Sequence, residues 1–137
     1  MQSRTLRIVT FAVALLALPA LAVAQFGHPL KGQWSGEAGT AGDSTRLLLD
    51  LGWDGKNITG TINPGSATEA EIRKVTFDYS KVTAWGVQLE AEGKDASGKP
   101  VQIRIDGTLE NLGAYYRVFH GTWTQGSQKK PFTLTRN

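Results

Sequence analysis

Large aromatic side chains are the residues of this chain best suited to binding a ligand. Those on predicted strands are Trp34, Trp53, Phe77, Tyr79, Trp85, Phe119, Trp123 and Phe132. Such rings either line the mouth of a cavity that accepts an apolar molecule or fill a hydrophobic core. We expect a ligand site formed by Trp34, Trp85, Phe119, Trp123 and Arg136, with plain core filling as the alternative.

The residues of catalytic type form no recognisable active-site pattern. His28 and His120 are far apart and lack an acid at ligand spacing, so no metal site is expected. Ser35 lacks the first glycine of a nucleophile elbow. The strand acids point outward, where no pocket would shift their pKa; they are Asp50, Asp78, Glu90, Glu92 and Asp106. We therefore expect no enzyme and no cofactor, with a hydrolase that uses acids at a barrel mouth as a weaker alternative.

The elements that must position these side chains are short runs of alternating apolar and polar residues. The expected strands cover residues 32–36, 45–53, 57–63, 75–80, 85–92, 101–106, 117–124 and 131–136. Strict alternation means that one face of the sheet is buried and the other is exposed to solvent, which favours an antiparallel sheet. We expect an all-β domain over residues 31–137, a single antiparallel up-and-down β-barrel of about eight strands. Residues 67–74 have weak helical character and are expected to be a connector that is partly extended.

A glycine at the centre of three predicted strands supports closure of the sheet. These strands share the pattern apolar-x-Gly-Thr-apolar, at residues 58–62, 105–109 and 119–123. The glycine falls on the inner face, where it allows a sharp bend and close approach of another backbone or a ring. This parity places His120 on the outer face, and a slip by one residue would turn it inward.

The first 24 residues have the composition of a cleavable, helical signal peptide. Arg4 and Arg7 precede an apolar run over residues 8–24, which ends in the small-x-small pattern Ala22-Val23-Ala24. A transmembrane anchor is the alternative, but it needs about 20 apolar residues, and this run is interrupted by a proline. We expect cleavage before Gln25, a flexible segment over residues 25–30 and a secreted or periplasmic product.

Charge and cysteine content narrow the function further. Removal of the two signal-peptide arginines reduces 15 basic side chains against 12 acidic ones to 13 against 12. A nearly neutral domain has no electrostatic footprint for nucleic acid or an anionic membrane. The chain has no cysteine, which excludes disulfides, thiol catalysis and a lipid anchor on cysteine at the cleavage site.

Three motifs lie near the start, the middle and the end of the predicted domain. They are Gly32-x-Trp34-x-Gly36, Asp54-Gly55 followed by Ile58-Thr59-Gly60-Thr61, and Gly121-Thr122-Trp123-Thr124-Gln125-Gly126 followed by Phe132-Thr133-Leu134-Thr135-Arg136. Together they resemble those of lipocalin-like (calycin-type) barrels, most closely the small barrel domains of bacterial secreted proteins. The resemblance implies that Trp34 packs across the closed end of the barrel and that a late arginine stacks on it, Arg136 or its rival Arg117.

The size of the domain bears on what such a barrel can hold. At 113 residues after cleavage it is shorter than typical lipocalins and lacks their C-terminal helix, so side chains can fill its interior. We expect a monomeric, exported, non-enzymatic protein that binds an apolar small molecule or an envelope or protein partner. The alternative is a structural or accessory barrel with a filled core. Tyr115 and Tyr116, beside a turn, would favour a carbohydrate or protein partner if exposed.

Overall fold

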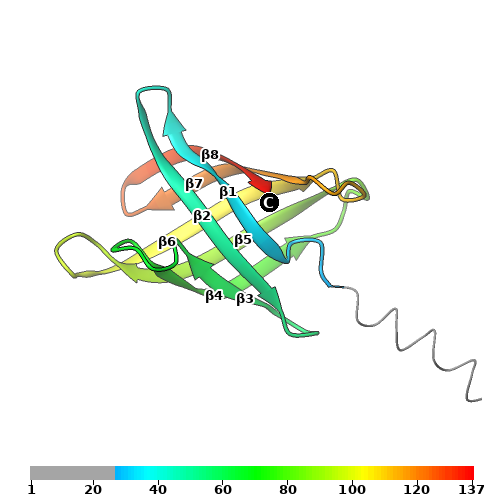
Figure 1. The fold of residues 1–137 in the computed structure, drawn as a ribbon, viewed down its shortest axis with the longest axis horizontal. Helices are drawn as coiled ribbons and strands as arrows, with labels where there is room; N and C mark the ends of the chain where they lie inside the picture. The colour runs from blue at the N-terminus through cyan, green and yellow to red at the C-terminus, as the bar shows by residue number, and fades with distance from the viewer. Residues whose placement is uncertain (1–26) are drawn as a thin grey trace, which may run out of the picture.

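The computed structural model describes residues 27–137, which form eight antiparallel strands closed into one barrel (Figure 1). The strands are β1 (Gly32–Thr40), β2 (Asp43–Trp53), β3 (Ile58–Ile62), β4 (Ala70–Asp78), β5 (Ala84–Lys94), β6 (Pro100–Glu110), β7 (Val118–Gln125) and β8 (Gln128–Arg136). Each strand pairs with its neighbour in the chain, and β8 pairs with β1. The predicted all-β up-and-down barrel is thus confirmed. The predicted signal peptide, residues 1–24, lies outside the described residues.

The interior of the barrel is filled by the inward-facing residues that the alternation predicted. Leu47, Leu49 and Leu51 of β2 are buried, as are the corresponding apolar residues of β5 and β6. Trp34 and Phe119 are completely buried, and their ring centroids lie 6.2 Å apart in an edge-on arrangement. Among residues 27–137 the fully buried side chains are all apolar, so the barrel is held together by hydrophobic packing.

Inward-facing glycines create room for the largest core rings. Gly107 of β6 lies opposite Gly121 of β7 in the ladder. A Cβ on Gly107 would lie 2.5 Å from Phe119 Cε2 and 2.9 Å from Phe132 Cζ. A Cβ on Gly121 would collide with the carbonyl oxygen of Asp106 on the neighbouring strand. The inner-face role predicted for these glycines is therefore confirmed.

One end of the barrel is closed by the N-terminal plug, which we define as residues 27–31. Leu30 is 0% exposed, and its carbonyl oxygen accepts a hydrogen bond of 2.8 Å from Trp34 Nε1. Arg117 donates from Nη1 to the Pro29 carbonyl at 3.1 Å and from Nε to the Leu112 carbonyl at 3.1 Å. In the part of the expected flexible segment that the structure describes, one apolar side chain and two carbonyl acceptors thus contact the barrel.

The segment expected to be a connector is largely part of a strand. β4 begins at Ala70, and a β-bulge at Arg73 shifts its pairing with β5 between Ile72 and Lys74. The extra residue lets Ile72 and Val75, three positions apart, both face the interior. A period-two pattern interrupted in this way does not indicate a regular strand. The sequence therefore predicted only a partly extended connector here, and the structure places residues 70–74 in β4. Within residues 27–137 no helix has the length and hydrophobicity that a membrane crossing requires.

Candidate functional site

The wall of the barrel opens between β3 and β4 near the plugged end. These strands pair only at Thr61 with Glu71 and at Ile62 with Ala70, whereas β5 and β6 share eleven residue pairs. Beyond those two pairs lies the side cleft, a hollow of about 470 Å³. Its lining residues are His28, Trp53, Asp54, Lys56, Asn57, Ile58, Thr59, Ile72, Arg73, Lys74, Val75, Phe77 and Tyr79. A volume of this size is within the range of small-molecule sites.

An aromatic cluster forms one wall of the side cleft. It consists of His28, Trp53, Phe77, Tyr79 and Trp85, of which all but Trp85 line the hollow. The imidazole centroid of His28 lies 4.7 Å from that of Phe77 and 4.9 Å from that of Trp53. Tyr79 stacks on Phe77 at 5.5 Å and meets Trp85 edge-on at 4.7 Å. Because Tyr79 is 55% exposed, the cluster is continuous from the core to the surface.

These rings meet because of where their strands begin and end. Trp53 is the last residue of β2, Phe77 is next to last in β4, and Trp85 is the second residue of β5. In an up-and-down barrel the end of an even strand and the start of the following odd strand lie at the same rim. The plug adds His28 to this rim.

His28 is held as a neutral side chain. Its Nδ1 accepts a hydrogen bond of 3.1 Å from the backbone N–H of Leu30, so the proton of the neutral ring is on Nε2. Burial against the rings lowers the pKa of His28 below its ordinary value of 6.5. The neutral ring therefore keeps one N–H donor, on Nε2, in a side chain that lines the cleft.

The rim of the cleft is basic. Lys56, Arg73 and Lys74 line it together with one acid, Asp54. Asp54 Oδ1 accepts hydrogen bonds from the backbone N–H of Asn57 at 2.6 Å and of Lys56 at 2.8 Å. These backbone donors hold the pKa of the Asp54 carboxyl below its usual value. One oxygen of the carboxylate is thus engaged in the turn between β2 and β3.

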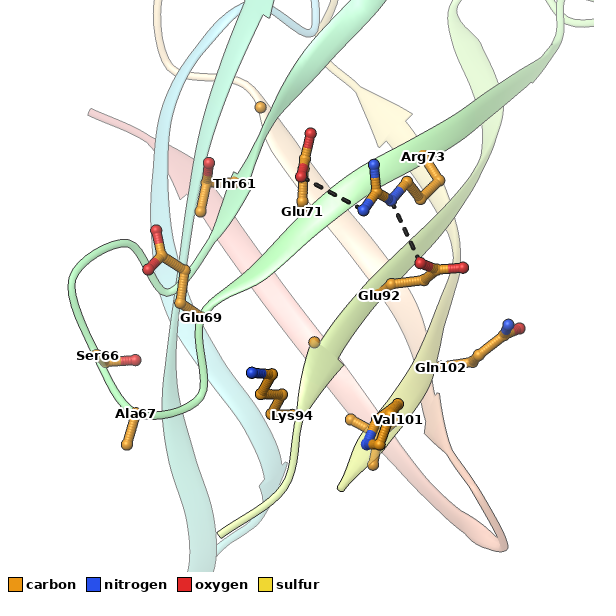
Figure 2. Close-up of a pocket in the computed structure, with 13 residues that line it drawn as sticks. Thr61, Ser66, Ala67, Glu69, Glu71, Arg73, Glu92, Lys94, Val101 and Gln102 are labelled. Atoms are coloured by element: carbon orange, nitrogen blue, oxygen red, sulfur yellow. Dashed lines mark ion pairs between the residues drawn. The ribbon is translucent and has the colours of Figure 1, made fainter. Parts of the chain in front are cut away.

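A larger, polar groove of about 1060 Å³ lies near the opposite end, between the β3–β4 loop and the outer surface of β4 to β6 (Figure 2). Glu71 and Glu92 are direct cross-strand neighbours there, and like charges so placed repel each other. Arg73 contacts both, at 3.5 Å and 3.4 Å, as the dashed lines in Figure 2 show. Because Arg73 bridges these two carboxylates and no aromatic residue lines the groove, the aromatic side cleft is the stronger candidate site.

The predicted ligand-site residues do not gather around one cavity. Trp34 and Phe119 are core residues, and Trp123 is partly buried against the same core. Trp85 belongs to the aromatic cluster at the cleft. Arg136 lies opposite Trp34 in the β1–β8 ladder, while its rival Arg117 bridges the plug to Leu112. Burial and the nearby charge of Arg136 lower the pKa of Arg117.

The other candidates lie on the outside of the barrel, as their strand parity predicted. His120 Nε2 lies 3.0 Å from Glu110 Oε1, with both side chains well exposed. Asp106 is engaged by Arg104, whose Nε and Nη2 donate to its two oxygens at 2.9 and 3.2 Å. Asp50, Asp78, Glu90 and Glu92 are exposed. Residues 27–137 contain no cluster of three or more His, Cys, Asp or Glu side chains that could hold a metal ion.

Sequence reasoning missed the side cleft, although part of the signal was present. Trp53, Phe77 and Trp85 were recognised as large rings, and their positions at strand ends place them at one rim. His28 gave no such signal, because nothing in its neighbourhood predicts that residues 27–31 turn under the barrel. Alternation alone also cannot show that β3 pairs with β4 at only two positions.

Comparison of the chain with protein-family models, with curated protein sequences and with solved structures gave no match. The eight-stranded antiparallel barrel is compatible with a lipocalin-like fold. The functional argument accordingly depends on the geometry of the cleft.

Proposed function

We propose that this chain is an exported, non-enzymatic binding protein whose ligand, an apolar small molecule, occupies the side cleft. The observation that carries the proposal is the aromatic cluster along one wall of a hollow of about 470 Å³. Aromatic walls with a few polar groups are the usual lining of small-molecule sites. Export is proposed from the signal-peptide pattern of residues 1–24, and the lipocalin-like relationship from the three motifs and the closed barrel.

The proposal places the ligand beside the barrel rather than inside it. Trp34 and Phe119 occupy the interior, where a typical lipocalin would hold its ligand, and both are completely buried. The cleft, in contrast, is reached from solvent past Tyr79. This arrangement supports a side-entry site.

Titration of the isotope-labelled mature chain with 2-naphthamide, a flat neutral molecule, tests the proposal by NMR. We expect amide shifts at residues 53–59 and 72–79, with little change around Trp34 and Phe119. Phe77→Ala should weaken binding about tenfold or more, because it removes a ring from the wall. Tyr115→Ala, in the β6–β7 loop and outside the lining of the cleft, is the control and should bind normally. Shifts centred elsewhere, or equal affinity of both variants, would contradict the assignment.

A protein partner is the second candidate, supported by a separate observation. Tyr115 and Tyr116 are 73% and 69% exposed, and their rings meet edge-on at 5.0 Å in the β6–β7 loop. Exposed tyrosines of this kind are enriched at protein interfaces. Loss of a co-purifying envelope protein on changing both tyrosines to serine, with 2-naphthamide affinity unchanged, would favour this function over the first.

A further inference from the structure

We infer that the side cleft selects an amphipathic anion, a small molecule with an apolar body and one negatively charged group such as a carboxylate. The inference rests on the proposed function, because it takes the cleft as the ligand site and assigns the charge of the ligand. It follows from the basic side chains on the rim, which outnumber the single acid of the lining.

The lining of the cleft carries more positive than negative charge, with three basic side chains and one acidic one. Arg73 is already engaged by Glu71 and Glu92. Among residues 27–137, Lys56 and Lys74 form no ion pair within 4 Å. Asp54 lies near Lys56, and Glu90 is opposite Lys74 in the β4–β5 ladder, so each lysine has one acid in its neighbourhood but no direct partner. Two ammonium groups at one hollow attract an anion and repel a cation.

The single acid of the lining offsets only part of the positive charge of the basic side chains. Asp54 Oδ1 accepts two backbone hydrogen bonds that shape the β2–β3 turn. An ion pair with a cationic ligand would have to compete with those donors and with the nearby ammonium group of Lys56. The cleft is therefore poorly suited to cations.

The lysines and the rings are close enough along the chain to contact one molecule. Lys56 follows Trp53 by three residues, and Lys74 precedes Phe77 by three. All four side chains line the same hollow. A ligand whose body packs on the rings would therefore place its charged group near one or both lysines. The Nε2–H of His28 adds a neutral donor in the same wall.

Calorimetric comparison of 2-naphthoate with 2-naphthamide tests the charge preference directly. The two probes have the same ring system and nearly the same size, and differ in charge at about pH 7.5. We expect 2-naphthoate to bind about three- to tenfold more tightly at low salt, as two exposed ion pairs would give. The advantage should shrink at about 0.3 M salt, where screening is strong.

Substitution of the lysines tests whether they cause the preference for 2-naphthoate. The double variant Lys56→Ala, Lys74→Ala should lose the preference for 2-naphthoate and keep its affinity for 2-naphthamide. Lys129→Ala on β8 removes a basic residue that does not line the cleft and should keep the preference. Thermal unfolding of each variant verifies that it folds.

The possible outcomes separate the two proposals. Equal or weaker binding of 2-naphthoate would overturn the anion preference and leave the cleft as a site for neutral ligands. A preference that survives in the double lysine variant would also overturn it. Failure of both probes to bind would reject the proposed function, and the inference with it.

Discussion

At the scale of single residues, His28 connects the closure of the barrel to the candidate site. Its Nδ1 bonds within the plug, and its ring packs on Phe77 and Trp53 of the aromatic cluster. A charged imidazolium would lose solvation in this position, which is the cause of its lowered pKa. Protonation of one side chain should therefore disturb both the plug and the cleft.

We expect stability to decrease as pH falls through the ordinary histidine range. The folded pKa of His28 lies below 6.5, so the unfolded chain binds the proton first as pH falls. The contribution of neutral His28 is complete above about pH 7 and is reduced below the unfolded pKa. Urea unfolding of wild type and His28→Phe across this range measures the effect.

The variant His28→Phe separates the effect of His28 on stability from the effects of other titrating groups. Asp54 and Asp78 have lowered pKa values because backbone N–H groups donate to them, so they affect stability only at more acidic pH. Near pH 6, the free energy of unfolding should change less with pH in His28→Phe than in wild type. Identical pH dependence of the two proteins would show that His28 is not its source.

At Gly107 the packing of the core leaves no room for a side chain. Alanine there would place a methyl group within 3 Å of two core rings, those of Phe119 and Phe132. We expect Gly107→Ala to lower the free energy of unfolding by about 1–3 kcal/mol through overpacking. Gly113→Ala is the control, because its Cβ would meet no atom within 4 Å. Chemical denaturation of both variants measures the difference, and equal stability would contradict the tight fit.

At the scale of elements, the plug acts as a lid on one end of the barrel. Leu30 inserts its side chain into the core, while Trp34 and Arg117 bind the carbonyl groups around it. The plug also carries His28 into the aromatic cluster. Loosening this segment should therefore affect the cleft as well as the core.

Leu30→Ala should destabilise the fold by about 2–5 kcal/mol, because it removes a fully buried side chain and leaves a cavity. Lys31→Ala, at the adjacent exposed position, should change stability by less than about 0.5 kcal/mol. Urea unfolding gives both values. Hydrogen exchange should also show faster exchange of the Leu30 amide in the first variant, whereas unchanged exchange would mean that Leu30 does not hold the plug.

Comparison of the strands with the sequence patterns shows how much of the fold could be predicted. The alternation of residues 45–53 and 101–106 predicted two strands and their inner faces, because each strand has one buried and one solvent-exposed face. The full length of β1, to Thr40, was missed because glycines interrupt its alternation. The site was predicted less well than the fold. Trp34 and Phe119 are large rings like Trp53 and Phe77, and only the three-dimensional register distinguishes core from cleft.

At the scale of the whole molecule, the barrel separates a solid interior from a side cleft. The interior contains Trp34 and Phe119 in contact, and the cleft is bounded by β3 and β4 where they diverge. Stability and ligand binding are thus assigned to different groups of aromatic residues.

Phe119→Ala should separate the two roles. It should lower the free energy of unfolding by about 3–5 kcal/mol, a loss that a domain of about 5–15 kcal/mol can survive. Its affinity for 2-naphthamide at the cleft should stay within about twofold of wild type, because Phe119 does not line the cleft. Denaturation and calorimetry on the same preparation measure both quantities. A large loss of affinity in a folded Phe119→Ala protein would place the ligand inside the barrel instead.

Closure of the barrel by β1 and β8 has a consequence for the order in which the chain folds. Ser35 Oγ donates to Asn137 Oδ1 at 2.7 Å across 102 residues of sequence, and the β1–β8 ladder joins the two extremes of the domain. Contacts this distant in sequence form slowly, because a long loop must be ordered first. Each hairpin can form as soon as its two strands are available. The barrel closes only when β8 pairs with β1. Until then β1 and β8 both have unpaired edges, the state in which a β-protein is most prone to aggregate.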